Sequence, residues 1–410
     1  MPAFPKLLVA TEFPPNAAGG GGAIVRQMLK EWPVEKLFWW SCLPDQSQTF
    51  GQRVASHALA AIPPKLNPKR RARRPKGWVL DTFWTPWAAR HFRQTLTRLR
   101  PDVVWVIPHG WSILPLARAL PAEGVPFHVS IHDYPDVRGM VESLGCDRCR
   151  RLAGLVDQLY ARANTRDTVC RQMSDDMRAR TGVPGDISRA GLEADDFAAL
   201  DATPPAGGDV IRIAYAGTVN VEREFALFAA ALDKIRPKLP RSVALEFFGD
   251  HSYRNRAWFN PTWMTERGNL SRGELSAALR QCTWGSSLMA LTDDDPRYNR
   301  FSLPSKLVSY LAAGLPVITL GHPESTLVKM ATAYSVGFCS TAAGVDALAA
   351  QLRPALAEPD PGARYRPGIR QCAQAEFNAA RLRSTICENL RKSAAARSAG
   401  GRPASFKFGA

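Results

Sequence analysis

The segment FSLPSKLVSYLAAGLPVI, residues 301–318, has the composition of an anion-binding helix followed by a strand. Pro304 and Ser305 suit the first turn of a helix, where unpaired backbone amides and the helix dipole favour a negative charge. Lys306 adds a positive charge at the same end, and Gly314 permits a tight return to the strand. This pattern predicts a phosphate site. The residues that we assign to it are Ser302, Ser305 and Lys306.

A second candidate lies near the N-terminus, where four glycines at 19–22 follow a short apolar run. Residues without side chains let backbone amides come very close to a bulky or anionic group. The sequence AIVRQMLKEW predicts a helix that starts where the glycines stop. We therefore expect Gly20, Gly21 and Gly22 to form a loop that contacts a ligand.

Polar residues also follow several apolar runs of strand length. His132 and Asp133 follow PFHVSI, and His109 follows DVVWVI. A histidine beside an acid at a strand end is either a catalytic group or a hydrogen-bonded structural one. We predict a catalytic role for His132 and Asp133 and a place on the acceptor side for His109. In the second half of the chain, the residues that follow strands are Gly217, Thr218 and Gly249.

Strand and helix patterns alternate in both halves of the chain, which predicts an α/β fold of two Rossmann-like parallel-sheet domains. In open parallel sheets, ligands bind beyond the carboxyl ends of the strands, so these polar residues are expected to converge on a cleft between the domains. The Pro- and Gly-rich stretch at 201–210 is typical of a linker. The expected parts are domains at 1–200 and 211–370, the linker at 201–210, a helix at 371–391 that crosses back to the first domain, and a disordered tail at 392–410.

The composition indicates a cytoplasmic chain with an anionic partner. A net charge of +16 favours association with anionic partners. No signal-peptide pattern and no apolar stretch of membrane-spanning length occur in the sequence. The cysteines are scattered, and only Cys146 and Cys149 form a CxxC pair, so we expect reduced thiols and no metal site. Asp293 to Asp295 form a DxD pattern that suits either a divalent metal or a solvated loop or helix cap.

The segment from Lys65 to Trp87 combines basic and aromatic residues. One interpretation is a peripheral contact with an anionic membrane at the inner face, in which arginines at 70, 71, 73 and 74 supply charge. The other is a solvated basic loop whose aromatics belong to the core. We expect no nucleic acid partner, because no recognition motif accompanies the charge.

Taken together, the motifs resemble those of the GT-B glycosyltransferases of the large retaining family four, the glycosyl transferases of group 1. The stretches that carry the resemblance are FPPNAAGGGGAIVRQMLKEW, IHD, MSDDMRARTG to RAGLEADDF, YAGTVNVERE, GNLSRGELSAAL and LPSKLVSYLAAGLPVI. The resemblance implies a nucleotide diphosphate sugar as donor in the second half and a polysaccharide, lipid-linked or other surface glycan as acceptor over the first half. It implies no cofactor and no metal. By that pattern Arg223 and Lys306 reach the donor diphosphate, and His132 lies near the transferred sugar. The backbone at Gly20 to Gly22 approaches the sugar phosphate and the acceptor, and Gly217, Thr218 and Gly249 also belong to the donor-binding residues.

The sequence departs from the family pattern at three donor positions. Thr218 stands where the family often has Arg, and Phe301 and Ser309 stand where many members have two glutamates. A carboxylate that accepts hydrogen bonds from a ribose makes strong charge-assisted contacts, so the donor stays open. Ser309 is kept among the donor-binding residues. The alternatives are a non-catalytic subunit of the same fold and a GT-B nucleotide-sugar epimerase or phosphorylase.

Overall fold

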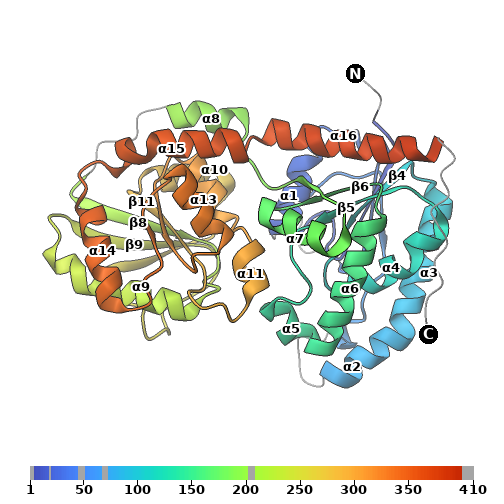
Figure 1. Ribbon diagram of the computed structural model, residues 1–410, viewed down its shortest axis with the longest axis horizontal. Helices are drawn as coiled ribbons and strands as arrows, with labels where there is room; N and C mark the ends of the chain where they lie inside the picture. The colour runs from blue at the N-terminus through green and yellow to red at the C-terminus, as the bar shows by residue number, and fades with distance from the viewer. Residues whose placement is uncertain (1–3, 18–19, 45–50, 67–72, 202–207, 399–410) are drawn as a thin grey trace. The chain divides into compact units, whose positions relative to one another are not determined.

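The computed structural model describes residues 4–17, 20–44, 51–66, 73–201 and 208–398 (Figure 1). The chain forms two compact units. Unit 1 comprises Met1–Arg189 and Ala380–Ala410, and unit 2 comprises Ala190–Ala379. Each unit has its own sheet and its own hydrophobic core, so each can position functional groups at the edge of its sheet.

Unit 1 contains a seven-stranded sheet in the order β3-β2-β1-β4-β5-β6-β7, in which all neighbouring strands are parallel. The strands are β1 (Leu7–Thr11), β2 (Leu37–Ser41), β3 (Ser56–Leu59), β4 (Val103–Ile107), β5 (Phe127–Ile131), β6 (Thr165–Thr168) and β7 (Asp186–Ile187). Every residue of β1, β4 and β5 is buried, as a parallel sheet covered on both faces requires. The strand order reverses between β1 and β4, which places the topological switch point there.

Most α-helices of unit 1 connect these strands, and α16, the last helix of the chain, packs against the same core. They are α1 (Gly20–Met28), α2 (Arg73–Val79), α3 (Thr85–Leu99), α4 (Ile113–Glu123), α5 (Arg138–Leu144), α6 (Cys146–Arg162), α7 (Arg171–Thr181) and α16 (Ala379–Ser398). A π-helical turn, η3 (Leu80–Trp84), joins α2 to α3. Short 3-10 turns lie at η1 (Val34–Lys36), η2 (Pro64–Leu66) and η4 (Gly110–Ser112).

Unit 2 contains a six-stranded parallel sheet in the order β10-β9-β8-β11-β12-β13. The strands are β8 (Val210–Ala216), β9 (Ser242–Phe248), β10 (Met264–Gly268), β11 (Trp284–Leu288), β12 (Val317–Leu320) and β13 (Cys339–Ser340). Its helices are α8 (Ala194–Asp201), α9 (Glu222–Ile235), η5 (Arg236–Lys238), α10 (Arg272–Arg280), α11 (Pro296–Phe301), α12 (Lys306–Ala312), α13 (Thr326–Tyr334), α14 (Val345–Ala357) and α15 (Pro361–Glu376).

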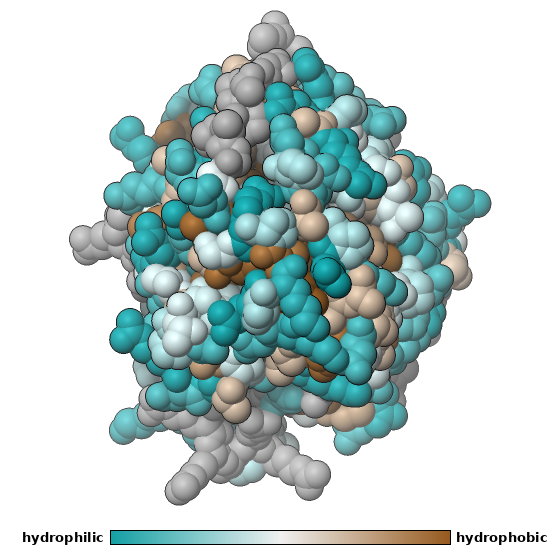
Figure 2. All heavy atoms as spheres, turned by 90° about the vertical axis from the view of Figure 1, so that its left-hand side faces the viewer, coloured by the Kyte–Doolittle hydropathy of each residue, from teal (hydrophilic) through white to brown (hydrophobic). Residues whose placement is uncertain are grey.

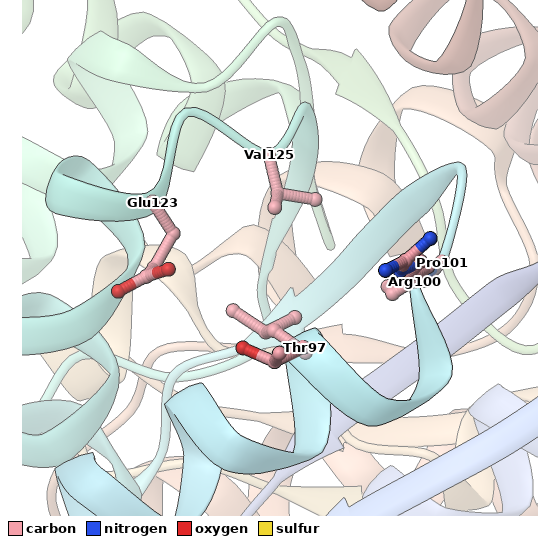
Figure 3. A pocket seen from close by; sticks show the side chains of 6 residues that line it. Thr97, Arg100, Pro101, Glu123 and Val125 are labelled. Atoms are coloured by element: carbon pink, nitrogen blue, oxygen red, sulfur yellow. The ribbon is translucent and has the colours of Figure 1, made fainter.

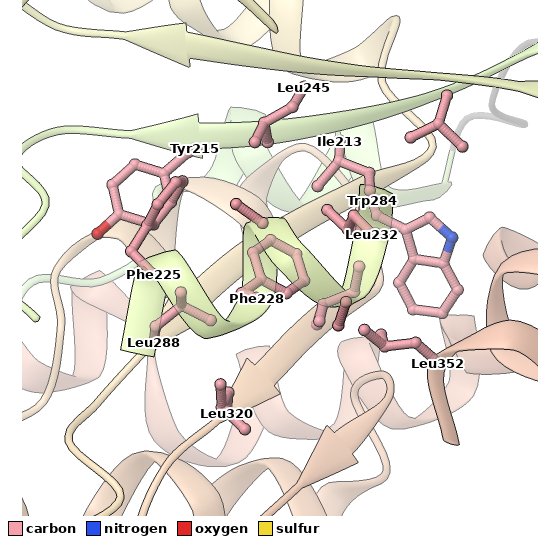
Figure 4. Packing of buried hydrophobic residues seen from close by; sticks show 14 of the residues in the cluster. Ile213, Tyr215, Phe225, Phe228, Leu232, Leu245, Trp284, Leu288, Leu320 and Leu352 are labelled. Carbon is pink, nitrogen blue, oxygen red and sulfur yellow. The ribbon is translucent and has the colours of Figure 1, made fainter. Parts of the chain in front are cut away.

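Helix α9 covers one face of the unit 2 sheet (Figure 4). Phe225, Phe228 and Leu232 recur at helical spacing and are fully buried, so they form a single apolar face. They pack against Ile213 of β8 and Leu245 of β9. The predicted fold class, two α/β units with parallel sheets, is confirmed.

The boundaries between the parts differ from those expected from the sequence. The division falls between Arg189 and Ala190, ahead of the expected linker at 201–210. The reason is packing, because Leu192 and Leu200 are buried in the core of unit 2. Residues 202–207 of that linker lie outside the described residues.

The helix expected at 371–391 is two helices. α15 contributes Ile369 and Cys372 to the core of unit 2, whereas α16 contributes Leu382 and Ile386 to the core of unit 1. α16 continues to Ser398, so residues 392–398 of the expected disordered tail are helical. The rest of that tail, 399–410, lies outside the described residues.

Hydrophilic side chains predominate on the face of the molecule in Figure 2, and hydrophobic ones gather in a narrow band near its middle. Among the helices that the structure describes, none is both long and apolar enough to cross a membrane.

Candidate functional site

The switch point of the unit 1 sheet is organised by Glu12, the residue after β1. Its Oε2 lies 2.8 Å from Nδ1 of His109, which follows β4, and its Oε1 accepts a hydrogen bond of 2.8 Å from the backbone N–H of Trp111. Gly110 lies between them with φ of 50°, and a Cβ there would fall 2.2 Å from the Glu12 carboxylate. Only glycine fits this position, and the contact holds the His109 ring at the edge of the sheet.

His132 lies at the same edge of unit 1, directly after β5. A Cβ placed on Gly21 would lie 3.7 Å from the His132 Nδ1, so the imidazole faces the start of α1. Both ring nitrogens are buried and have no hydrogen-bond partner in the described part of the chain. Burial, reinforced by the charge of His109 and opposed by Asp167, lowers the pKa of His132 from 6.5 to about 4. The imidazole is therefore neutral near pH 7 and available to a ligand.

The glycines that were expected to form a loop are the first turn of a helix. α1 begins at Gly20, so the prediction that the helix starts after the glycines is wrong. The close packing of the backbone explains why glycine stands at position 22, because a Cβ there would lie 2.6 Å from the carbonyl oxygen of Ala17. One turn later, Arg26 donates to that same carbonyl, and burial lowers the pKa of its guanidinium. Residues 18–19 lie outside the described residues.

In unit 2, glycines end three neighbouring strands at the carboxyl edge of the sheet. Gly217 follows β8 with φ of 83°, and Gly249 follows β9 with φ of 154°. The backbone N–H of Gly217 donates to Phe248 at 2.7 Å, and that of Gly249 donates to Gly268 at 2.9 Å. These bonds hold the strand ends together, and the missing side chains leave the edge accessible to a large ligand.

Lys306 reaches this edge from the first position of α12. Its Nζ lies 3.8 Å from the centroid of the Tyr215 ring and 3.4 Å from the carbonyl oxygen of Thr218, to which it donates. Within the described ranges, no carboxylate pairs with it. Burial therefore lowers the pKa of Lys306 from 10.5 to about 7. Lys306 is half-buried, so its ammonium is partly removed from water without a counter-charge, and an anionic ligand would relieve that cost.

Tyr310 fixes the helix that carries Lys306. It lies one turn further along α12, and its hydroxyl accepts a hydrogen bond of 2.8 Å from the N–H of Ala216. The same hydroxyl donates to the carbonyl of Ser286 at 3.1 Å. Since Gly285 has no Cβ, the Tyr310 ring lies directly on β11. Lys306 is thus anchored to both β8 and β11.

The remaining residues predicted for the donor site lie in unit 2 near these strand ends. Thr218 is exposed, and its hydroxyl lies 3.4 Å from Nδ1 of His251. Arg223 is exposed in the first turn of α9 and makes no ion pair with any described residue. Ser302 is buried at the end of α11, Ser305 is exposed just before α12, and Ser309 is half-buried within α12.

The acidic triplet holds its own loop together. Asp295 caps α11 by accepting a hydrogen bond of 3.3 Å from the N–H of Tyr298. Asp293 pairs with Arg300, and Asp294 accepts a hydrogen bond from the nearby Thr292. These contacts favour the helix-cap interpretation over the metal one. No group of three or more metal-ligating side chains occurs among the described residues.

A cavity of about 300 Å³ lies elsewhere in unit 1 (Figure 3). It is formed where α3 and α4 end, next to the start of β4, and so lies at the amino edge of the sheet. Ligands of open parallel sheets bind at the opposite edge, and we do not assign this cavity to the site. Its lining residues are Leu96, Thr97, Arg100, Pro101, Glu123 and Val125.

His109 and His132 were predicted from the sequence, whereas Glu12 and Arg26, which lie at the same strand ends or at the start of α1, were not. The signal for Glu12 was its place directly after the first strand, the position at which the other candidates were identified. The signal for Arg26 was its helical spacing from Gly22. Asp133 follows His132 and is half-buried at the same strand end.

No protein-family profile and no curated protein sequence matches the chain. Solved structures match it over almost its full length. Sucrose-phosphate synthase from Thermosynechococcus elongatus aligns with a TM-score of 0.65 and 16% identity, covering 95% of this chain and 99% of that one. HepE from Anabaena, solved in complex with UDP, aligns with a TM-score of 0.66 and 11% identity, covering 94% and 99%.

An α,α-trehalose-phosphate synthase (UDP-forming) from Burkholderia xenovorans, solved with glucose-6-phosphate, aligns with a TM-score of 0.64 and 15% identity. The alignment covers 94% of this chain and 100% of that one. At these identities the likeness concerns the fold. It confirms the GT-B architecture that the sequence motifs predicted.

Proposed function

We propose that the protein is a glycosyltransferase that moves a sugar from a nucleotide diphosphate sugar to a glycan acceptor. The observation that carries this proposal is Lys306, a half-buried ammonium with no carboxylate partner among the described residues, at the glycine-lined edge of the unit 2 sheet. Proteins with the same fold include HepE, solved with UDP, and a UDP-forming trehalose-phosphate synthase. A nucleoside diphosphate supplies the anion that Lys306 lacks.

In the reaction, an acceptor hydroxyl forms a bond to the anomeric carbon while the bond from that carbon to the diphosphate breaks. The proton of the hydroxyl leaves with the diphosphate. Lys306 stabilises the negative charge that develops on the leaving group, because a fixed ammonium in a poorly hydrated place acts strongly on nearby charge. Arg223 is the second cation proposed for the diphosphate. Gly217 and Gly249 leave room for it against the backbone.

We assign the sugar and the acceptor to the residues at the carboxyl edge of unit 1. His132 is neutral near pH 7 and has no internal partner among the described residues, so it can hydrogen-bond a sugar hydroxyl. Asp133 follows it in the chain. His109, held by Glu12, is proposed to orient the acceptor.

The acceptor that we propose is a polysaccharide, lipid-linked or other surface glycan, met at the inner face of a membrane. We propose further that the chemistry uses neither metal nor cofactor. Activity should then persist in a chelator. Activity that a chelator abolishes and Mn²⁺ restores would revive a metal role for Asp293 to Asp295.

A thermal-shift screen against nucleoside diphosphates tests the donor site, because a ligand that binds only the folded state raises the melting temperature. We expect one diphosphate to stabilise the wild-type protein and to lose this effect in Lys306→Met. Lys329→Met is the matched control, because Lys329 lies in the same unit but pairs with Glu324 at 2.6 Å. Stabilisation of Lys306→Met equal to that of the wild type would refute the assignment.

Two alternatives predict different products. An epimerase of this fold would isomerise the nucleotide sugar without an acceptor. A non-catalytic subunit, which the absence of glutamates at Phe301 and Ser309 motivates, would leave the nucleotide sugar unchanged and need an active partner.

A further inference from the structure

Three aromatic side chains of unit 1 are exposed within one short helical stretch. Trp78 and Phe83 are each 63% exposed, and Trp87 is 47% exposed. Two other large hydrophobic residues of the described chain are exposed, Val34 and Leu59, and both are less so at 37% and 36%. We call Trp78, Phe83 and Trp87 the aromatic stripe.

The π turn η3 brings the three rings onto one face. Trp78 and Phe83 are five residues apart, a spacing that in an α-helix points side chains in different directions. A π turn closes i→i+5 bonds, so residues five apart lie one above the other. The two rings accordingly meet edge to face with centroids 6.0 Å apart. Trp87 follows one ordinary helical turn after Phe83 and extends the stripe.

The opposite face of the same stretch packs into unit 1. Leu80, Trp84 and Phe92 are buried, and the Trp84 Nε1–H donates to the carbonyl of Ala61 at 3.1 Å. Ala88 is buried on the same side. The stretch from α2 to α3 is therefore amphipathic in an unusual sense: its inner face belongs to the core, and its outer face presents large aromatic rings to solvent.

Basic residues flank the stripe along the chain. Asp81 is the single acidic residue between Lys65 and Arg100 in the sequence. Its carboxylate is paired with Arg148 and adds no net negative charge. Arg90 is exposed one turn after Trp87, and Lys76 is half-buried near Trp78. The arginines at 70 and 71 lie outside the described residues, as do the side chains of those at 73 and 74.

We propose that the aromatic stripe inserts into the interfacial region of an anionic lipid bilayer and that the surrounding cations bind lipid headgroups. Helices that bind a membrane surface without crossing it combine exposed tryptophan and phenylalanine with unpaired lysine and arginine. Because the residues around the stripe are basic, we propose an anionic bilayer rather than a neutral one. Only the role that we give to this membrane contact rests on the proposed function: the contact would bring a membrane-held acceptor to the enzyme.

Co-sedimentation with lipid vesicles tests the inference. The wild-type protein should bind vesicles of phosphatidylglycerol and phosphatidylcholine, should not bind phosphatidylcholine alone, and should be released by salt. Brominated lipids should quench its tryptophan fluorescence, and Trp78→Phe with Trp87→Phe should reduce that quenching. Replacing all three rings with serine should weaken binding by about tenfold or more, since each ring that inserts into the bilayer adds to the binding. Replacing Lys76 and Arg90 with glutamine should weaken binding and reduce its salt dependence.

Serine at Val34 and Leu59 is the matched control, because these residues are also apolar and exposed in unit 1 but lie outside the stripe. This variant should bind vesicles like the wild type. All variants should keep the wild-type melting temperature and the response to a nucleoside diphosphate, which shows that they are folded.

Equal binding of the triple serine variant and the wild type, or equal binding of neutral and anionic vesicles, overturns the inference. A wild-type dimer in light scattering that the triple substitution dissociates, with no vesicle binding, also overturns it and identifies the stripe as an interface between copies. Vesicle binding needs no donor. A protein that binds vesicles through the stripe but transfers no sugar would contradict the proposed function and leave this inference standing.

Discussion

The protonation of Lys306 should control the affinity for a nucleoside diphosphate between about pH 7 and about pH 9. Burial lowers the pKa of Lys306 to about 7. The ammonium form, which binds an anion, therefore loses population above that pH. Its fraction falls from about one half at the lower pH to about one hundredth at the higher one. The terminal phosphate of a nucleoside diphosphate loses its last proton near the lower end of this range, so its own titration offsets only a small part of the change.

The expected loss of affinity is about fiftyfold, which corresponds to about 2 kcal/mol. Binding should also raise the pKa of Lys306, because the bound anion favours the charged form. About one proton should then be taken up per diphosphate bound at the alkaline end of the range. In Lys306→Met the affinity should be weak at the lower pH and should not change further as the pH rises.

Isothermal titration calorimetry measures both quantities. Titrations in two buffers with different ionisation enthalpies give the proton uptake, and the affinities give the slope with pH. Lys329→Met should keep the wild-type slope, because Lys329 is paired with Glu324 outside the site. A wild-type affinity that does not change with pH, or an equal slope in Lys306→Met, would refute the assignment of the diphosphate to this ammonium.

Three further outcomes are expected. Without ligand, Lys306→Met should raise the free energy of unfolding near pH 7 by about 1 to 3 kcal/mol. Between the folded pKa of about 7 and the ordinary value of 10.5, the unfolded chain binds more protons than the folded one, so the free energy of unfolding of the wild type should rise with pH. The free energy of unfolding of Lys306→Met should not show this rise. Urea titrations at about pH 7 and about pH 10.5 measure both. Gly22→Ala should lower the melting temperature, because its Cβ would lie 2.6 Å from the Ala17 carbonyl, whereas Gly21→Ala, with its closest contact at 3.4 Å, should keep stability and lose activity through the site that it faces. Tyr310→Phe should cost about 1 to 3 kcal/mol in urea unfolding, because a buried backbone N–H loses its acceptor.

Residues that follow strands could be predicted from the sequence because the rule behind them is topological. Every open parallel sheet presents its carboxyl ends at one edge, so Gly217, Gly249 and His132 could be identified from apolar runs alone. Lys306 could be predicted as a candidate because its neighbours Pro304 and Ser305 have the chemistry of a helix start. Lys306 is unusual because a ring lies beside it and, among the described residues, no carboxylate does; both features depend on packing that the sequence does not display.

Long-range contacts account for what the sequence did not reveal. Glu12 and His109 are 97 residues apart, and they meet only because β1 and β4 are neighbours in the sheet. The helix start at Gly20 was missed because glycine is a poor helix former, and here close backbone packing outweighs that propensity. The π turn was missed because Trp78 and Phe83 do not share a face at the period of an α-helix.

The most direct test of the proposed function follows a sugar label through the reaction. A nucleotide sugar of the base selected by the thermal-shift screen, labelled in its sugar, is incubated with the protein and a glycan and lipid extract as acceptor. We expect the label in the glycan or lipid fraction, with one nucleoside diphosphate released per sugar transferred, in the wild type and Lys329→Met but not in Lys306→Met. Label that stays entirely in the nucleotide-sugar fraction, unchanged or as an isomer, would contradict glycosyl transfer.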